Sequence, residues 1–158
     1  MRQVRSANTT PEKKVRSLLH RLGFRFRLHR QDLPGKPDIV LPKHASVVFV
    51  HGCFWHRHPG CPRATIPATH QDYWLPKFKR TVERDKRNQI ELRRLGWRVA
   101  VVWECELRDL DQLAKRLTIA IAGGPVPYSK NVSVVQMAAE PHPGFGSGQN
   151  KRVSADTD

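Results

Sequence analysis

The chain has 158 residues, a length that favours a single domain with its own hydrophobic core. It carries 28 lysines and arginines against 14 acidic residues, a formal net charge of +14. The surplus lies in residues 1–122, because basic and acidic side chains balance in residues 123–158. Nucleic acid is the usual partner of so basic a protein, and a solvated basic surface without a partner is the plainer alternative.

The composition also excludes several classes of protein. Three cysteines, an odd number, argue against a disulfide framework. The N-terminus is basic and has no apolar segment, so we expect no signal peptide, and no apolar run is long enough to cross a bilayer. We therefore expect a cytoplasmic protein whose reduced thiols are free to bind a metal.

The first elements are marked by clear start and stop signals. Residues 1–9 are polar and basic and are expected to form a flexible arm. A helix is predicted to begin at Thr10 as the N-cap and to end at Gly23. Alternating apolar and charged residues then predict a half-buried strand over residues 24–28.

The later elements follow from apolar periodicity. They are strands at 38–41 and 46–50, a helix at 77–95, a strand at 97–103 and a helix at 109–122. The strand at 46–50 is apolar on both faces and should be central. The element order α-β-β-β-α-β-α predicts an α/β fold, a mixed sheet flanked by helices. Residues 123–158, rich in glycine and proline, are expected to be disordered, which leaves residues 10–122 as the folded domain.

A loop rich in cysteine and histidine follows the strand at 46–50. Cys53, His58 and Cys61 have a spacing that suits a tetrahedral metal. Cys105, just after the strand at 97–103, completes a set of three cysteines and one histidine that is typical of structural zinc. Two alternatives stay open: His56 in place of His58, and buried thiols without a metal.

Three further residues are candidates for catalysis. Asp38 follows a proline at the start of a strand, where a carboxylate can bind a hard cation such as Mg²⁺, although such a pair is commonly only a turn. The strand at 46–50 offers neither a second carboxylate nor a lysine. His51 and His56 titrate near neutral pH and are the candidates to fill that gap.

Two acidic residues lie on or beside apolar helix faces. Asp85 is at the centre of the inward stripe of the helix at 77–95, where a carboxylate without a partner is costly. It should meet a histidine or a cation, or form an ordinary ion pair with an arginine such as Arg84. For Glu12, in the first turn of the first helix, position alone favours stabilisation of the helix dipole.

Adjacent aromatic residues stand out in the same loop. Phe54 and Trp55 follow one another between a cysteine and a histidine, and both cannot point into one core. Wedging into a stack of bases is the functional interpretation. Trp97 and Trp103, by contrast, are expected in the core.

Several motifs together resemble those of the very short patch repair (Vsr) endonucleases, which nick DNA at T:G mismatches. The motifs are Pro-Glu-Lys in the first helix, Leu-Pro-Gly-Lys-Pro-Asp, His-Gly-Cys-Phe-Trp-His, Val-Glu-Arg-Asp, and Leu-Gly-Trp-Arg-Val with Val-Trp-Glu-Cys. The similarity spans residues 1 to 122. It implies the PD-(D/E)XK-like, or restriction-endonuclease-like, nuclease fold with a structural zinc site.

The resemblance also implies roles for single residues. Asp38 matches a Mg²⁺-binding aspartate, and Val50 matches a position whose backbone carbonyl is also a ligand. Glu12 matches a further active-site acid, against the helix-dipole interpretation. The other matched positions are the active-site histidines His51 and His56, the carboxylate Asp85, the zinc ligands Cys53, His58, Cys61 and Cys105, the aromatic wedge Phe54, Trp55 and Trp74, and the base-contacting Lys77.

The function expected from the sequence is Mg²⁺-dependent, zinc-stabilised nicking of one strand of double-stranded DNA at a T:G mismatch. We expect a monomer associated with the bacterial nucleoid and functionally linked to a cytosine methyltransferase. The alternatives are a restriction or junction endonuclease of the same fold, and a zinc-stabilised DNA-binding module without catalysis, which would have no use for Asp38.

Overall fold

The structure, a computed structural model, describes residues 7–123. In chain order its elements are α1 (Thr10–Arg21), β1 (Arg27–Leu28), β2 (Ile39–Leu41), the 3-10 helix η1 (Pro42–His44), β3 (Ser46–His51), α2 (Gln71–Arg94), β4 (Arg98–Trp103), the 3-10 helix η2 (Glu104–Arg108) and α3 (Leu110–Ala122). The predicted disorder of the tail, and most of the predicted flexible arm, fall outside the described residues.

The four strands form one mixed sheet in the order β1-β2-β3-β4. β2 is antiparallel to β1 and to β3, and β3 is parallel to β4, so β3 is an inner strand as its apolar faces predicted. In the parallel pair His51 lies opposite Trp103. The chain segments that follow these two strands therefore leave the sheet at the same edge.

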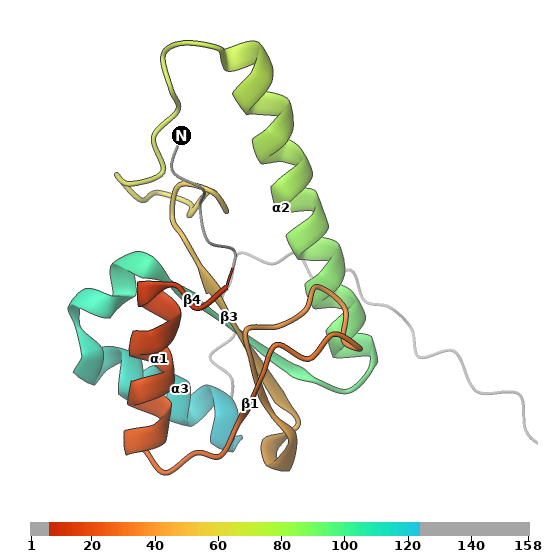
Figure 1. Cartoon of the computed structure of the whole chain (residues 1–158), viewed down its shortest axis with the longest axis vertical. Coiled ribbons are helices and arrows are strands. Elements are labelled where there is room, and N and C mark those ends of the chain that lie inside the picture. Colours follow the sequence, from red (N-terminus) through yellow and green to blue (C-terminus); the bar gives the residue numbers. More distant parts are fainter. Residues whose placement is uncertain (1–6, 124–158) are drawn as a thin grey trace, which may run out of the picture. The chain divides into compact units, whose positions relative to one another are not determined.

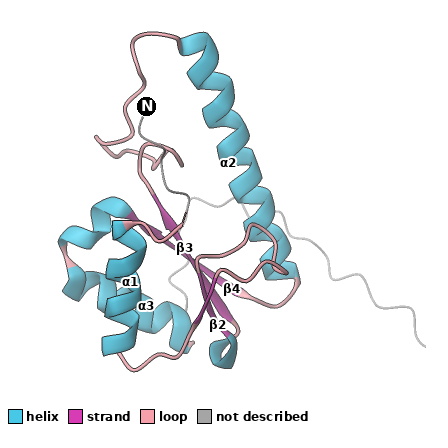
Figure 2. Cartoon of the chain, viewed as in Figure 1, coloured by secondary structure: helices cyan, strands magenta, loops and turns pink. Residues whose placement is uncertain are grey.

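Helices cover both faces of the sheet. Figure 1 shows α1 and α3 on one side of the strands and α2 on the other, and Figure 2 shows the strands between them. The two cores follow from the alternation of side chains along each strand. Ile39, Leu41 and Val48 pack with α1 and α3, whereas Val40 and Val47 pack on the face of α2. The predicted mixed sheet with flanking helices is confirmed.

The start of α1 differs by one residue from the prediction. The N-cap is Thr9, not Thr10, and its hydroxyl accepts a hydrogen bond from the backbone N–H of Glu12 at 3.4 Å. The Thr9 hydroxyl in turn donates to Oε1 of Glu12 at 3.0 Å. This reciprocal capping fixes the Glu12 side chain, which is buried.

Helix α2 begins at Gln71, six residues before the predicted start at Lys77. Pro76 lies inside the first turns, where its missing N–H removes a single hydrogen bond. The added turns carry Trp74 into contact with Phe54 and Phe78, with ring centroids 5.7 and 5.6 Å apart. Aromatic packing therefore outweighs the loss of one backbone hydrogen bond.

The first strand is shorter than predicted. β1 contains only Arg27 and Leu28, both exposed, instead of residues 24–28. Phe24 and Phe26 still pack against the core shared with α1 and α3. His29 directly follows the strand and has a left-handed backbone conformation with φ 49°. Among residues 7–123, no helix combines the length and apolar character that crossing a membrane needs.

Candidate active site and metal-binding residues

Three cysteines and a histidine meet where β3 and β4 end. Nδ1 of His58 lies 3.8 Å from Sγ of Cys53 and 3.3 Å from Sγ of Cys105. These atoms and Sγ of Cys61 all lie within 4.8 Å of one another. The parallel pairing of β3 with β4 brings Cys105 to the loop, because both segments leave the sheet at one edge.

The donor set fits a tetrahedral metal. Three thiolate sulfurs and one imidazole nitrogen at these separations suit zinc, whose bonds to sulfur are about 2.3 Å long. Without a metal, burial raises the pKa of the Cys53 thiol to about 12, so this sulfur needs a cation to be a thiolate at neutral pH. The structure places His58, and not His56, with the cysteines.

A second cluster is formed by His51 at the end of β3, His56 in the following loop and Asp85 of α2. Nδ1 of His56 lies 2.6 Å from Oδ2 of Asp85. The ring of His56 stacks on that of His51, with centroids 3.8 Å apart and planes 7° apart. Oδ1 of Asp85 also lies 3.4 Å from Nη2 of Arg84. Both of the expected partners of Asp85, a histidine and an arginine, are therefore present, and the histidine is the closer one.

The electrostatics give His51 and Asp85 different charge states. Burial and the charge of His56 lower the pKa of His51 to about 3, so His51 is neutral at pH 7. Burial alone would raise the pKa of Asp85, but its hydrogen bond to His56 and the nearby cationic charges outweigh that effect and leave the pKa below its usual value. Asp85 is therefore an anion that accepts a hydrogen bond from Nδ1–H of His56.

Asp38 lies in the same region, immediately before β2. Its Oδ2 accepts a hydrogen bond from the backbone N–H of Val50 at 2.7 Å, which ties it to the end of β3. Burial raises the pKa of Asp38 to about 6, and the Glu12 carboxylate also raises it, while His29 and His56 act in the opposite direction. Asp38 thus shares one electrostatic environment with the histidine cluster.

Glu12 and His29 complete a third cluster with Asp38. One ligand atom from each of these three residues lies within 4.8 Å of the other two. Nη2 of Arg16 contacts both Oε2 of Glu12 and Nε2 of His29 at 2.9 Å. Sequence reasoning missed His29 and Arg16, because no local spacing relates them to Asp38. A histidine directly after a short strand was the only signal.

The aromatic side chains form one continuous cluster at the start of α2. The ring centroids of Phe54 and Trp55 are 5.1 Å apart. Their distances to the ring centroid of Trp74 are 5.7 and 5.8 Å. The two rings belong to one cluster but do not both point into the core, as expected, because Trp55 stays at the surface. Phe54 is also in contact with Phe78, whereas Trp55 is 36% exposed. Lys77 lies 5.3 Å from the centroid of the Trp55 ring, so a cation borders the exposed aromatic surface.

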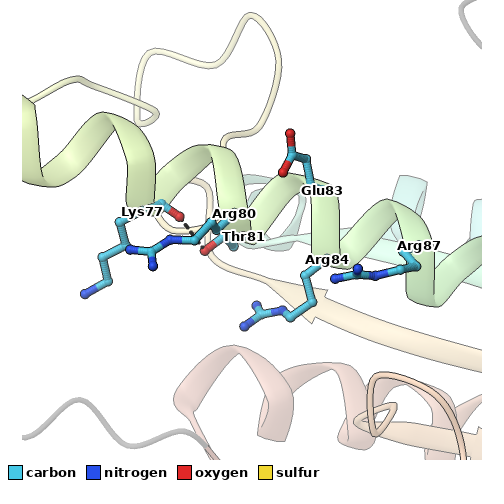
Figure 3. Close-up of a pocket in the computed structure, with 6 residues that line it drawn as sticks. All are labelled: Lys77, Arg80, Thr81, Glu83, Arg84 and Arg87. Carbon is cyan, nitrogen blue, oxygen red and sulfur yellow. Dashed lines mark hydrogen bonds between the residues drawn. The ribbon is translucent and has the colours of Figure 1, made fainter.

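A row of cations continues from Lys77 along α2. Lys77, Arg80, Arg84 and Arg87 line a shallow hollow together with Thr81 and Glu83. Figure 3 shows Arg80 and Arg84 extending to one side of the helix, and Glu83 to the opposite side. Because these cationic residues are three or four positions apart, they share one face of the helix. Such a row can follow a phosphate backbone.

Comparisons with known proteins agree with this geometry. A family model described as "DNA mismatch endonuclease Vsr" matches residues 1–62. A "Type II nicking enzyme V.XorIIP" of Xanthomonas oryzae pv. oryzae is 60% identical over 117 residues, which cover 74% of this chain and 85% of that protein. The "DNA mismatch endonuclease Vsr" of Escherichia coli (strain K12) is 45% identical over 113 residues, covering 72% of each chain.

A solved structure shares the fold. The "Homing Endonuclease I-Bth0305I Catalytic Domain" superposes with a TM-score of 0.50 and 23% sequence identity, covering 72% of this chain and 94% of that one. At this identity the likeness concerns the fold alone. It confirms the PD-(D/E)XK-like nuclease architecture.

Proposed function

The chain belongs to the Vsr family of DNA mismatch endonucleases, and on this premise we propose that it nicks one DNA strand beside a T:G mismatch in a Mg²⁺-dependent reaction. One observation carries the proposal. The carboxylate of Asp38 and the His56–Asp85 pair lie at one edge of the sheet, next to an exposed tryptophan and a row of cations.

The residues around Asp38 fit a hard divalent cation. Asp38 and Glu12 bring two carboxylates to one place, and repulsion between them contributes to the raised pKa of Asp38. A cation there would be held by Asp38 and the backbone carbonyl of Val50, and it would supply Lewis-acid polarisation of the scissile phosphate and a more acidic water. Glu12, which has a ligand atom within 4.8 Å of one on Asp38, would add a second carboxylate to this site.

His56 is the group that moves a proton in this proposal. Because Nδ1–H of His56 donates to Asp85, its Nε2 is the atom that takes a proton from water or gives one to the leaving oxygen. His51, neutral at pH 7, supports the ring of His56 by stacking and does not add a second positive charge.

Zinc has a structural role in the proposal. Cys53, His58, Cys61 and Cys105 would fill all four positions of a tetrahedral ion and leave none for water. The ion would join the loop after β3 to η2 and so hold the ends of both strands. Phe54, Trp55 and Trp74 would border the mismatch, with Lys77 beside a base.

The proposed substrate and the proposed functional partner follow from membership of the family. The protein acts on double-stranded DNA as a monomer at the nucleoid, and it is functionally linked to a cytosine methyltransferase. The non-catalytic alternative is set aside, because the relatives are named as an endonuclease and a nicking enzyme.

The test compares duplexes that differ by a single base, one with T:G and one with T:A. Each strand is labelled in turn, and nicks are mapped with and without Mg²⁺. We expect one nick in one strand of the T:G duplex. Equal cutting of the T:A duplex would favour a restriction-type activity, and cutting without any divalent cation would refute the Mg²⁺ assignment.

Two carboxylate variants complete the test. Asp38→Ala should bind the T:G duplex and not nick it. Asp32→Ala is the matched control, since Asp32 is exposed and pairs with Arg30. Full nicking by Asp38→Ala, or equal loss in both variants, would contradict the role of Asp38.

A further inference from the structure

His29 lies in the centre of the site without a role in the mechanism described so far. It reaches Glu12 and Asp38 from a third element, at the end of β1, and one of its ring nitrogens lies within 4.8 Å of ligand oxygens on both. Glu12, His29 and Asp38 stand 17 and 9 positions apart in the sequence. Only the fold brings two carboxylates and one imidazole to the same point.

The backbone at His29 is held in an unusual conformation. Its φ of 49° lies in the left-handed region, which is unfavourable for a non-glycine residue. Such conformations persist where the surrounding structure fixes them, and they cluster at functional sites. Here the turn ends β1 and leaves His29 only partly exposed, beside the buried carboxylate of Glu12.

We propose that the imidazole of His29 is a protein ligand of the divalent cation, beside the carboxylates of Glu12 and Asp38, and that it makes the site bind Mn²⁺ more tightly than Mg²⁺. The inference rests on the proposed function, because it deepens the cation site placed there at Asp38.

The separations suit a single ion. Oxygen and nitrogen ligands lie about 2.0–2.2 Å from Mg²⁺ or a first-row divalent metal, so two ligands of one ion are at most about 4.4 Å apart. One ligand atom from each of the three side chains lies within 4.8 Å of the other two. Small side-chain rotations would bring these atoms within the separation that one ion requires. Glu12 and Asp38 supply the negative charge, and His29 supplies a neutral nitrogen.

Arg16 shows that this group of side chains already binds a cation. Its Nη2 bridges Oε2 of Glu12 and Nε2 of His29, at 2.9 Å from each. A guanidinium can only donate hydrogen bonds, so Nε2 of His29 is unprotonated and directs its lone pair into the site. Nε of Arg16 is buried and has no hydrogen-bond partner, so the guanidinium is incompletely satisfied in this position. A divalent ion that reaches all three groups would replace the guanidinium.

The imidazole decides which ion is preferred. Mg²⁺ favours oxygen ligands and keeps several waters, whereas first-row divalent metals accept imidazole nitrogen readily. Mn²⁺ also accepts carboxylates, so it suits both parts of the set. The preference for Mn²⁺ over Mg²⁺ should therefore depend on His29.

Mn²⁺ binding to the zinc-loaded protein tests this inference without a nicking assay. Free Mn²⁺ is followed by its electron paramagnetic resonance signal, and Mg²⁺ is then added as a competitor. His29→Gln should weaken Mn²⁺ binding by about tenfold or more, since loss of even an outer partner of a metal costs this much. Mg²⁺ binding should change less. His20→Gln, at an exposed histidine of α1, is the matched control and should bind like wild type.

Two further measurements keep the test decisive. Pulsed resonance spectra of wild type with Mn²⁺ should show hyperfine coupling to an imidazole nitrogen, and this readout needs no variant. Its absence, or unchanged Mn²⁺ affinity in His29→Gln, would overturn the inference. Asp38→Ala separates the two proposals. Mn²⁺ binding lost in Asp38→Ala but kept in His29→Gln refutes only the role of His29, whereas binding kept in both refutes the cation site itself.

Discussion

Replacing Asp38 by asparagine should abolish nicking and at the same time stabilise the fold. The carboxylate is partly buried beside Glu12, and its pKa in the folded protein is about 6 against 3.8 for the unperturbed group. A pKa difference of this size corresponds to about 3 kcal/mol at about 1.4 kcal/mol per pH unit. The fold therefore holds this charge at a cost that a neutral amide of the same shape removes.

The pH dependence has a definite sign. Because the folded state binds the Asp38 proton more tightly than the unfolded state does, the penalty grows as the pH rises from 3.8 and is complete above pH 6. Asp38→Asn should raise the free energy of unfolding by up to about 3 kcal/mol at pH 7.5 and by about half as much at pH 5. The amide oxygen of this variant can still accept the hydrogen bond from the backbone N–H of Val50.

Urea unfolding of wild type and variant, zinc-loaded and without Mg²⁺, measures the difference. Asp32→Asn, at an exposed carboxylate beside Arg30, is the control and should bring no gain at pH 7.5. Mg²⁺ at ten times its dissociation constant should stabilise wild type by about 1.4 kcal/mol and leave Asp38→Asn unchanged. Equal stability of wild type and Asp38→Asn at pH 7.5, or a gain that does not shrink at pH 5, would refute the reasoning.

Other changes separate the remaining parts of the site. Asp85→Asn should lower kcat about a hundredfold or more and keep DNA affinity, because His56 loses the anion that fixes its tautomer. Single-turnover nicking measures this loss, and an unchanged rate would mean that the His56–Asp85 pair is only structural. Cys105→Ser should lose one equivalent of zinc by elemental analysis and unfold at a lower temperature, whereas zinc-free wild type would contradict the assignment. Trp55→Ala should keep its zinc and lower the ratio of nicking rates on T:G and T:A duplexes, and a constant ratio would make Trp55 a packing residue. Changing Arg84 and Arg87 to glutamine should reduce the slope of log affinity against log salt concentration by about two, and an unaltered slope would remove this face of α2 from the DNA interface.

The fold could largely be predicted from periodicity. The apolar run of β3 marked an inner strand, and the inward stripe of α2 marked Asp85 as a carboxylate in need of a partner. The first residues of α2 could not be predicted, because the tertiary packing of Trp74 extends the helix beyond the periodic segment.

The site was predictable where spacing or strand ends fixed it. Cys105 could be assigned to the loop cysteines because it was the one remaining cysteine and follows a strand, and the parallel pairing of β3 with β4 explains why they meet. His29 could not be found in this way. Its approach to Asp38 depends on a left-handed turn and on the position of α1, and neither leaves a pattern in the sequence. The role of Glu12 could not be decided from its position in the sequence either. Its side chain both contacts the N-cap residue Thr9 and lies beside Asp38.

The register of β3 against β4 limits how the protein can vary. His51 lies directly opposite Trp103, and Cys53 and Cys105 each follow two residues later. Inserting or deleting one residue in either strand would turn every later side chain of that strand to the other face. The cysteines would then no longer meet, and His51 would leave His56. In relatives the lengths of these two strands should therefore be constant, and natural insertions should fall in the loop before α2.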